Sequence, residues 1–275
     1  MDHERLILDQ FTRQATPFST APGISDERAL HMIVTAARPD PDDTVLDLAC
    51  GGGLIVCAFA PRVRHATGID LTPAMLARAR ALAAERGITN VTWREGDISA
   101  LPWPDATFNI VVTRFSLHHL LDPLGALREM VRVCRPGGRV VVADMYASED
   151  PEKAAAWNRL EVLRDPSHVR VLSLTELKAL FPAAGLPAPE AAFYELRSDV
   201  DSLLARSFPN PGDERRIVAL FAAQAERDSM GIEVRSDNGT LRYAYPVAIL
   251  GSTRTAPTLD AGGSAEDAAA HDQPP

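Results

Sequence analysis

The chain has 275 residues, which suffices for one large α/β domain with additions or for two small domains, and we expect one. Its formal net charge is −9 at pH 7, and it contains no basic run that could contact phosphates. General nucleic-acid binders and proteins of anionic membrane surfaces are therefore disfavoured, and a small-molecule partner fits better.

Residues 1–40 precede the first predicted strand and are expected to be mainly helical. A first helix is followed by a turn-rich break at 17–23, which contains prolines and a glycine. Ser25 is then expected to N-cap a helix over 26–38, and Pro39 to end it.

The stretch 44–53, TVLDLACGGG, predicts a strand, a glycine turn and the start of a helix. Its three glycines would let backbone N–H groups approach a ligand, and the helix that follows presents its positive end, so the nearest part of the ligand should be anionic. The dinucleotide fingerprint G-x-G-x-x-G is not met, because Leu54 or Val56 stands where the third glycine is needed. A nicotinamide-dependent oxidoreductase is therefore a weaker alternative.

The second strand is expected over 66–70. Its last residue, Asp70, follows the glycine turn at close to the ~20 residues at which Rossmann-like folds place a carboxylate against ribose hydroxyls. Thr72 should N-cap the next helix. Leu71 and Met75 lie at the start of that helix, where they could support an adenine ring or simply pack in the core.

The third strand is expected over 91–95, with Asp97 and Ile98 just beyond it. A carboxylate at this position can accept a hydrogen bond from the exocyclic amine of adenine, and the next backbone N–H can donate to a ring nitrogen. An aspartate of a surface loop is the structural alternative.

An apolar run over 108–113 predicts a central parallel strand, buried on both faces. It leads to Arg114 and then to His118 and His119, at the edge of the sheet where open α/β folds bind ligands. Arg114 could pair with an anionic group of a cofactor or substrate, or with a local acid such as Asp122.

The remaining elements follow weaker signals. Ser173 opens a helix through a capping box with Glu176. The others are helices over 54–60, 124–134, 151–163 and 213–228, a turn over 135–138, and strands over 139–144, 191–196 and 241–250.

The spaced residues Asp47, Ala49, Gly51 and Gly53 resemble the first motif of class I S-adenosylmethionine-dependent methyltransferases, in which an acidic residue ends the first strand and the glycine loop holds the methionine part of the cofactor. The run LREMVRVCRPGGR at 127–139 matches the motif before the fifth strand of that family. The nearest branch is the small-molecule type of ubiquinone and menaquinone biosynthesis, methyltransferase type 11. Ala49 departs from the usual first glycine of the motif.

This resemblance implies an α/β fold: a Rossmann-like, doubly wound, mostly parallel seven-stranded sheet with an antiparallel edge strand, plus an N-terminal helical lid. Asn109 stands where the family usually has aspartate, which puts one buried hydrogen bond in question. The expected parts are the lid at 1–40, a cofactor-binding core at 41–147, substrate-side helices and closing strands at 148–250, and a disordered tail at 251–275.

The implied cofactor is S-adenosylmethionine. The residues expected to hold it are Asp47, Ala49, Gly51, Gly53, Asp70, Leu71, Met75, Asp97, Ile98 and Arg114. For the lid and the substrate pocket, the nearest matching positions are Phe11, Gln14 and Phe18, although a tyrosine is more usual at the last of these.

The methyl group of this cofactor is already electrophilic, so the protein must mainly align a nucleophile and exclude water. A hydroxyl or an acidic carbon can also need a base, and histidine suits neutral pH. The candidate bases are His118, His119 and His168, with a structural role as the alternative for each. His119 precedes Leu-Leu-Asp and resembles a pocket histidine of several small-molecule methyltransferases.

The predicted function is transfer of a methyl group to an O or C nucleophile of a small organic acceptor, such as a quinone, a phenol or a natural product. An enzyme that uses the sulfonium only electrostatically, to assist cyclisation or decarboxylation, is the main alternative. A pure binding module is a further one.

Cys50, Cys57 and Cys134 lack C-x-x-C spacing, so neither a disulfide framework nor a metal site is indicated. The N-terminus has no apolar signal region, and no apolar run reaches the ~18 residues of a membrane span. We therefore expect a cytoplasmic protein without membrane insertion or nucleic-acid binding. A homodimer is compatible with the sequence, which does not identify the acceptor.

Overall fold

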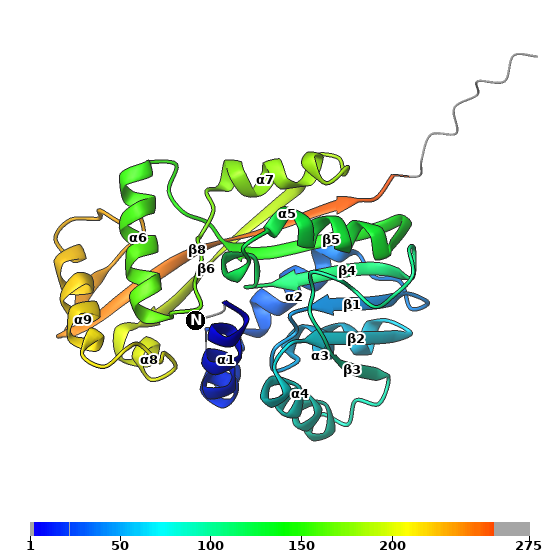
Figure 1. The fold of residues 1–275 in the computed structure, drawn as a ribbon, viewed down its shortest axis with the longest axis horizontal. Helices are drawn as coiled ribbons and strands as arrows, with labels where there is room; N and C mark the ends of the chain where they lie inside the picture. The colour runs from blue at the N-terminus through cyan, green and yellow to red at the C-terminus, as the bar shows by residue number, and fades with distance from the viewer. Residues whose placement is uncertain (1–2, 22, 256–275) are drawn as a thin grey trace, which may run out of the picture.

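The computed structural model describes residues 3–21 and 23–255. Its centre is one eight-stranded sheet with the order β3-β2-β1-β4-β5-β8-β6, in which the short β7 pairs with β8 (Figure 1). The strands are β1 (Thr44–Leu48), β2 (His65–Asp70), β3 (Val91–Glu95), β4 (Phe108–Arg114), β5 (Cys134–Met145), β6 (Glu190–Asp199), β7 (Arg235–Asp237) and β8 (Thr240–Thr253).

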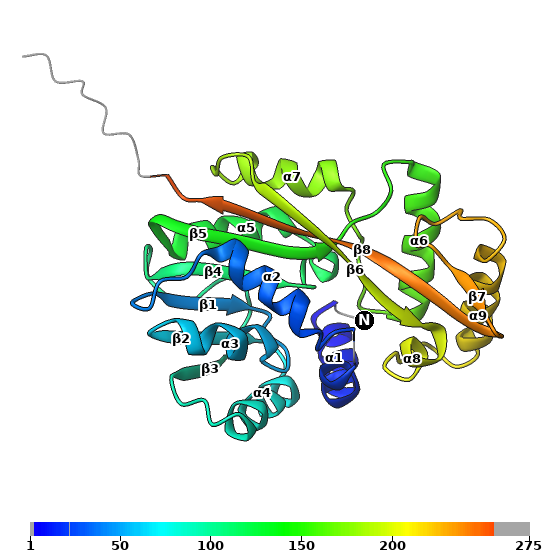
Figure 2. The same ribbon diagram turned by 180° about the vertical axis from the view of Figure 1, so that it is seen from behind.

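Helices cover both faces of the sheet. α2 and α3 pack on one face, whereas α5 and α7 pack on the other, as the two opposite views show (Figures 1 and 2). The helices are α1 (His3–Thr20), α2 (Glu27–Ala37), α3 (Leu54–Phe59), α4 (Pro73–Glu85), α5 (Pro123–Val133), α6 (Pro151–Arg164), α7 (Leu174–Ala183), α8 (Val200–Leu204) and α9 (Asp213–Gln224).

The hydrophobic core has two layers, one on each side of the sheet. Ile33 of α2 and Val56 of α3 are fully buried in the first layer, and Leu127 of α5 and Phe181 of α7 are buried in the second. β1, β2, β3, β4 and β5 run parallel, so their carboxyl ends meet at one edge of the sheet. The predicted doubly wound, mostly parallel α/β fold is confirmed.

The position predicted for the antiparallel strand, at the edge of the sheet, is wrong. β8 lies between β5 and β6 and not at the edge of the sheet. Pro246 is tolerated inside it because pairing with β5 ends at Val247, one residue away. The Pro246 carbonyl accepts a hydrogen bond from the Tyr146 N–H, just beyond β5. The proline nitrogen lies on the same side of the strand as this carbonyl and therefore faces the end of β5. Little strand pairing is lost there for lack of an N–H.

The N-terminal elements also differ from expectation. α1 continues through Pro17, so the predicted break begins only after Thr20. Buried residues on both sides of the proline keep this helix against the body of the protein. Asp26, and not Ser25, caps α2, because its carboxylate accepts from the Arg28 N–H while the Ser25 hydroxyl bonds back to the Ala21 carbonyl.

Several other sequence-based details are now decided. The Asn109 side chain accepts from the N–H and the hydroxyl of Thr44, so the hydrogen bond in question is made. The capping box of Ser173 and Glu176 is present at α7.

The predicted turn at 135–138 belongs to β5, where the register with β4 shifts. α9 ends at Gln224 and therefore earlier than predicted. The tail predicted as disordered from residue 251 begins too early, because β8 continues to Thr253; from residue 256 onward the predicted tail lies outside the described residues.

Candidate functional site

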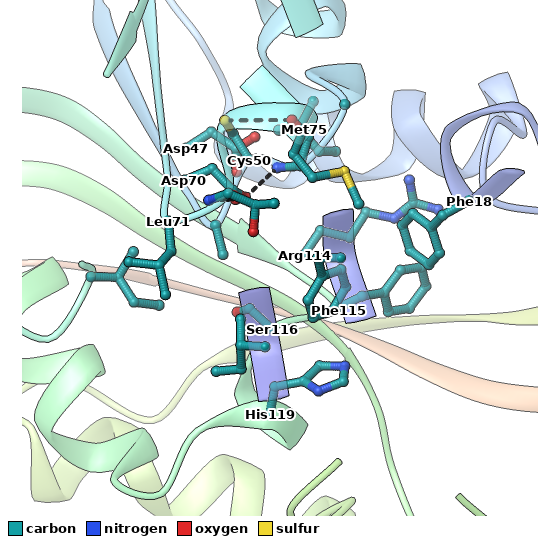
Figure 3. Close-up of a pocket in the computed structure, with 18 of the residues that line it drawn as sticks. Phe18, Asp47, Cys50, Asp70, Leu71, Met75, Arg114, Phe115, Ser116 and His119 are labelled. Atoms are coloured by element: carbon teal, nitrogen blue, oxygen red, sulfur yellow. Dashed lines mark hydrogen bonds between the residues drawn. The ribbon is translucent and has the colours of Figure 1, made fainter. Parts of the chain in front are cut away.

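A cavity opens at the carboxyl ends of the parallel strands, next to α1 (Figure 3). The space between its lining atoms is about 990 Å³, with open solvent at the mouth included. In Figure 3, Asp47, Asp70 and Cys50 lie toward one end, Arg114 and Phe115 near the middle, and His119 at the other end. The cavity therefore occupies the place where α/β folds bind ligands.

The three predicted strand-end carboxylates all line this one cavity. Asp47 is 1% exposed, and neither of its carboxylate oxygens has a hydrogen-bond partner. Asp70 accepts from the N–H groups of Gly51 and Thr72, each at 2.8 Å. Asp97 is exposed and accepts from the N–H and the hydroxyl of Ser99.

Burial, reinforced by the charge of Asp70, raises the pKa of Asp47 well above its ordinary value. Burial also raises the pKa of Asp70, against the opposing effect of its two backbone hydrogen bonds. The N–H of Gly51 is taken by Asp70, and that of Gly53 by the Cys50 carbonyl. These two N–H groups are thus engaged within the protein, and the carboxylates of this wall favour a cationic group.

The residues of the glycine turn have two roles, because some line the cavity and one allows close packing of α3. Gly51, with φ +50°, and Gly52 line the cavity, and Ala49 also lines it with a positive φ of 50°. Gly53 does not line it. A Cβ on Gly53 would lie 2.6 Å from the Trp93 ring and 2.8 Å from the Ala79 Cβ. Gly53 therefore allows close helix packing and is not a lining residue, whereas Gly52, which the sequence placed in the turn but not among the cofactor-binding residues, lines the cavity.

Leu71, Met75 and Ile98, which we expected near an adenine ring, line the same cavity as Asp97. Met75 and Ile98 are buried, whereas Leu71 is half-buried. They provide an apolar surface beside a carboxylate, which is the combination that recognition of a purine requires.

Arg114 lies at the end of β4 and is 9% exposed. One of its terminal nitrogens donates to the Ile24 carbonyl at 2.8 Å, but Nε and Nη2 have no partner. The guanidinium also stacks on the Phe115 ring at 4.5 Å. It does not pair with Asp122, which instead caps α5 through the Gly125 N–H. Arg114 therefore keeps donors free for an anionic group.

A second cavity adjoins the first. The residues that line both are Phe11, Phe18, Ile24, Phe115 and His119. Those that line only the second are Gln14, His118, Met145, Arg164, Asp165, Leu196, Leu203, Arg206 and Tyr245. The structure thus brings the three predicted lid positions to this region. The charged residues from 164 to 206 carry no motif and were missed.

The helix α1 is fastened over these cavities at two points. The Gln14 amide donates to the Asp165 carboxylate at 2.9 Å, and both side chains are buried. Ser19 covers the glycine turn so closely that a Cβ on Gly52 would lie 2.1 Å from its Oγ. α1 thus lies over both cavities, and its role as a lid stays a prediction.

His119 is the candidate base that lines both cavities. Its Nδ1 lies 3.1 Å from the Ser167 carbonyl, which can only accept, so Nδ1 carries the proton and Nε2 is left as an acceptor. Burial, together with the neighbouring His118, lowers the pKa of His119 to about 4. At neutral pH the ring is therefore uncharged.

The other two histidines have structural partners. His118 Nδ1 lies 2.6 Å from the Asp144 carboxylate, and its ring lines only the second cavity. His168 lines neither cavity, and its Nε2 donates to the Asn158 side chain. Burial lowers its pKa to about 3. The expected role of His168 as a base is corrected to one in packing.

Taken together, these observations fit a ligand with cationic and anionic groups at one end and a purine at the other. The unpaired Asp47 oxygens suit the cationic part, and the free donors of Arg114 suit the anionic part. Within residues 3–21 and 23–255, no helix is both long and apolar enough to cross a membrane.

Comparison with known proteins identifies the family of the chain. Residues 46–142 match the family model of the methyltransferase domain. An uncharacterized methyltransferase of Bacillus subtilis, YcgJ, is 31% identical over 242 residues, which are 87% of this chain and 96% of that protein. The ubiquinone/menaquinone biosynthesis C-methyltransferase UbiE of Bdellovibrio bacteriovorus is 36% identical over 159 residues, covering 56% of this chain and 67% of its own. The crystal structure of YcgJ aligns with a TM-score of 0.77 over 84% of this chain and 99% of that one, at 30% identity.

Proposed function

The chain belongs to the class I S-adenosylmethionine-dependent methyltransferases, and we propose that its acceptor is a small organic molecule, methylated at an oxygen or carbon atom beneath α1. The observation that carries this proposal is the pair of adjoining cavities: the strand-end acids line one, and apolar and aromatic side chains line the other together with the charged Arg164, Asp165 and Arg206. His119 lines both of them. We infer that the first cavity takes the cofactor and the second the acceptor.

In the first cavity, the buried Asp47 carboxylate would face the positive groups of the cofactor, since it has no partner within the protein. Arg114 would hold the cofactor carboxylate with its two free donors. Asp70 would keep the glycine turn and the start of α4 in place, because its two oxygens hold Gly51 and Thr72. The bound cofactor supplies an electrophilic methyl group.

In the second cavity, α1 would exclude water while the acceptor is aligned. An oxygen or carbon nucleophile that takes the methyl group supplied by the cofactor would also have to lose one proton. His119 would take this proton on Nε2, which its hydrogen bond to Ser167 leaves unprotonated. Because its pKa is lowered to about 4, it suits an acceptor whose own proton is acidic, such as a phenol or an activated carbon.

The test is incubation of the purified protein with a small-molecule extract and S-adenosylmethionine carrying an isotope label in its methyl group. We expect a labelled product, heavier than its precursor by one methyl group, together with one equivalent of S-adenosylhomocysteine. Conversion of an extract component without consumption of the cofactor would contradict the proposal and favour a purely electrostatic use of the sulfonium.

A further inference from the structure

Arg206 is a buried cation on the wall of the second cavity. It follows α8, the helix beside α1 in both views (Figures 1 and 2), and it is 6% exposed. Its guanidinium donates to the Tyr243 hydroxyl at 3.1 Å and to the Ser202 carbonyl at 3.5 Å, which are both neutral groups. Among the described ion pairs, none includes Arg206. Buried charges are normally paired, so this one is suited to a partner that the protein does not supply.

The other charged groups on this wall are already engaged. Arg164 lies 2.6 Å from the buried Glu161 carboxylate, which also accepts from the Tyr245 hydroxyl at 2.6 Å. Asp165 holds Gln14 and Ser167.

His118 also lies on this wall, and its Nδ1 is 2.6 Å from the Asp144 carboxylate. Arg206 is thus the cation of this cavity that lacks an acidic partner among the described residues.

The uncharged residues of the second cavity indicate which kind of ligand body fits there. Phe11, Phe18, Phe115, Leu203 and Tyr245 supply apolar and aromatic surface. A ligand with one charged end and an apolar body fits such a wall. Since His119 lines the same cavity as Arg206, such a ligand can reach both residues at once.

We propose that the acceptor is an apolar or aromatic carboxylic acid, whose carboxylate is bound by Arg206. This inference rests on the proposed function and adds the class of substrate to it. A planar guanidinium pairs well with a carboxylate. A phosphate monoester fits less well, because its charge of nearly −2 would face one unpaired cation and the nearby carboxylate of Asp165.

The experiment measures binding to protein that is first saturated with S-adenosylhomocysteine. The probes are cinnamate, its neutral analogue cinnamamide, and phenyl phosphate, each titrated by calorimetry. We expect cinnamate to bind and the amide and the phosphate to bind at least tenfold more weakly. Equal binding of cinnamate and cinnamamide, preference for the phosphate, or no binding of cinnamate would each overturn the inference.

Two variants and a control assign the site. Arg206→Gln should weaken cinnamate about ten- to hundredfold, the effect of losing a hydrogen-bonded charge, and Arg206→Lys should lose less. Arg197→Gln, an exposed control outside the second cavity, should bind as the wild type does. Unchanged affinity in Arg206→Gln would refute the assignment.

Binding of S-adenosylhomocysteine shows whether the inference about Arg206 fails alone or the proposed function fails as well. If the wild type and Arg206→Gln both bind it but cinnamate shows no dependence on Arg206, only the present inference fails. If the wild type does not bind it at all, the proposed function itself fails.

Discussion

The buried Asp47 carboxylate should destabilise the protein when no ligand is present. It is 1% exposed, and both of its oxygens lack partners, so its charge is not compensated by hydrogen bonds. Replacing it by asparagine keeps the shape of the side chain and removes the charge. We therefore predict that Asp47→Asn makes the cofactor-free protein more stable and, at the same time, weakens binding of S-adenosylmethionine.

An unsatisfied buried polar group costs about 1–3 kcal/mol and a charged one costs more; because the asparagine amide also lacks partners, the gain is the extra cost of the charge, on the order of 1 kcal/mol. For a domain of this size, each kcal/mol corresponds to a change in Tm of about 2–4 °C. The effect depends on pH, because burial and Asp70 raise the folded-state pKa of Asp47 above its unfolded value of about 3.9. Below about pH 4 both states are protonated and the cost is absent. It grows as the pH rises through the folded-state pKa.

The assay is urea unfolding without cofactor at pH 8 and at pH 4.5. The advantage of Asp47→Asn should be largest at pH 8 and should shrink at the lower pH. Asp97→Asn is the matched control, since it makes the same change of charge at an exposed carboxylate of the same cavity and should alter stability by less than about 0.5 kcal/mol. A cofactor-free Asp47→Asn variant that unfolds at lower urea than the wild type at pH 8 would refute the reasoning.

Three further changes test the geometry of the site. Ala49→Gly should raise the free energy of unfolding by up to about 1 kcal/mol in urea titrations, because residue 49 has a φ of 50°, and a loss of stability would contradict this. Gly52→Ala should displace α1, because the new Cβ would collide with Ser19, and residues 3–20 should then exchange their amide hydrogens faster. Adding Ser19→Gly should restore their protection. Unchanged exchange in Gly52→Ala alone would contradict the close contact between Gly52 and Ser19. His119→Gln should slow methyl transfer by about 10²–10⁴ with cofactor affinity unchanged, and the wild-type rate should fall only as the pH drops through about 4; a variant as fast as the wild type would exclude the base.

Much of the cofactor half of the site could be predicted from the sequence. Short strands with an acidic residue at or just beyond their carboxyl ends place Asp47, Asp70 and Asp97 at one edge of a parallel sheet, and the structure brings all three to one cavity. The motif could not separate the roles of Gly52 and Gly53. Which glycine faces the ligand depends on the packing of α3 against side chains from other elements.

The acceptor half could not be predicted in the same way. Gln14 and Asp165 are separated by 151 residues, yet their hydrogen bond fastens α1 over the second cavity. Arg206 comes from a segment without motif or strong periodicity, and only the folded chain shows that it is buried without an acidic partner. Local pattern carries no information on such contacts, because they depend on how distant elements dock.

The central claim is that the cavity bounded by the three acidic strand ends binds S-adenosylmethionine, and calorimetric titration of the full chain tests it most directly. We predict that the wild-type protein binds one cofactor molecule per chain and that this binding saturates. We also predict much weaker binding to Asp70→Ala, in which the N–H groups of Gly51 and Thr72 lose their shared acceptor. No saturable binding to the wild type, or equal affinity in the two proteins, would contradict it.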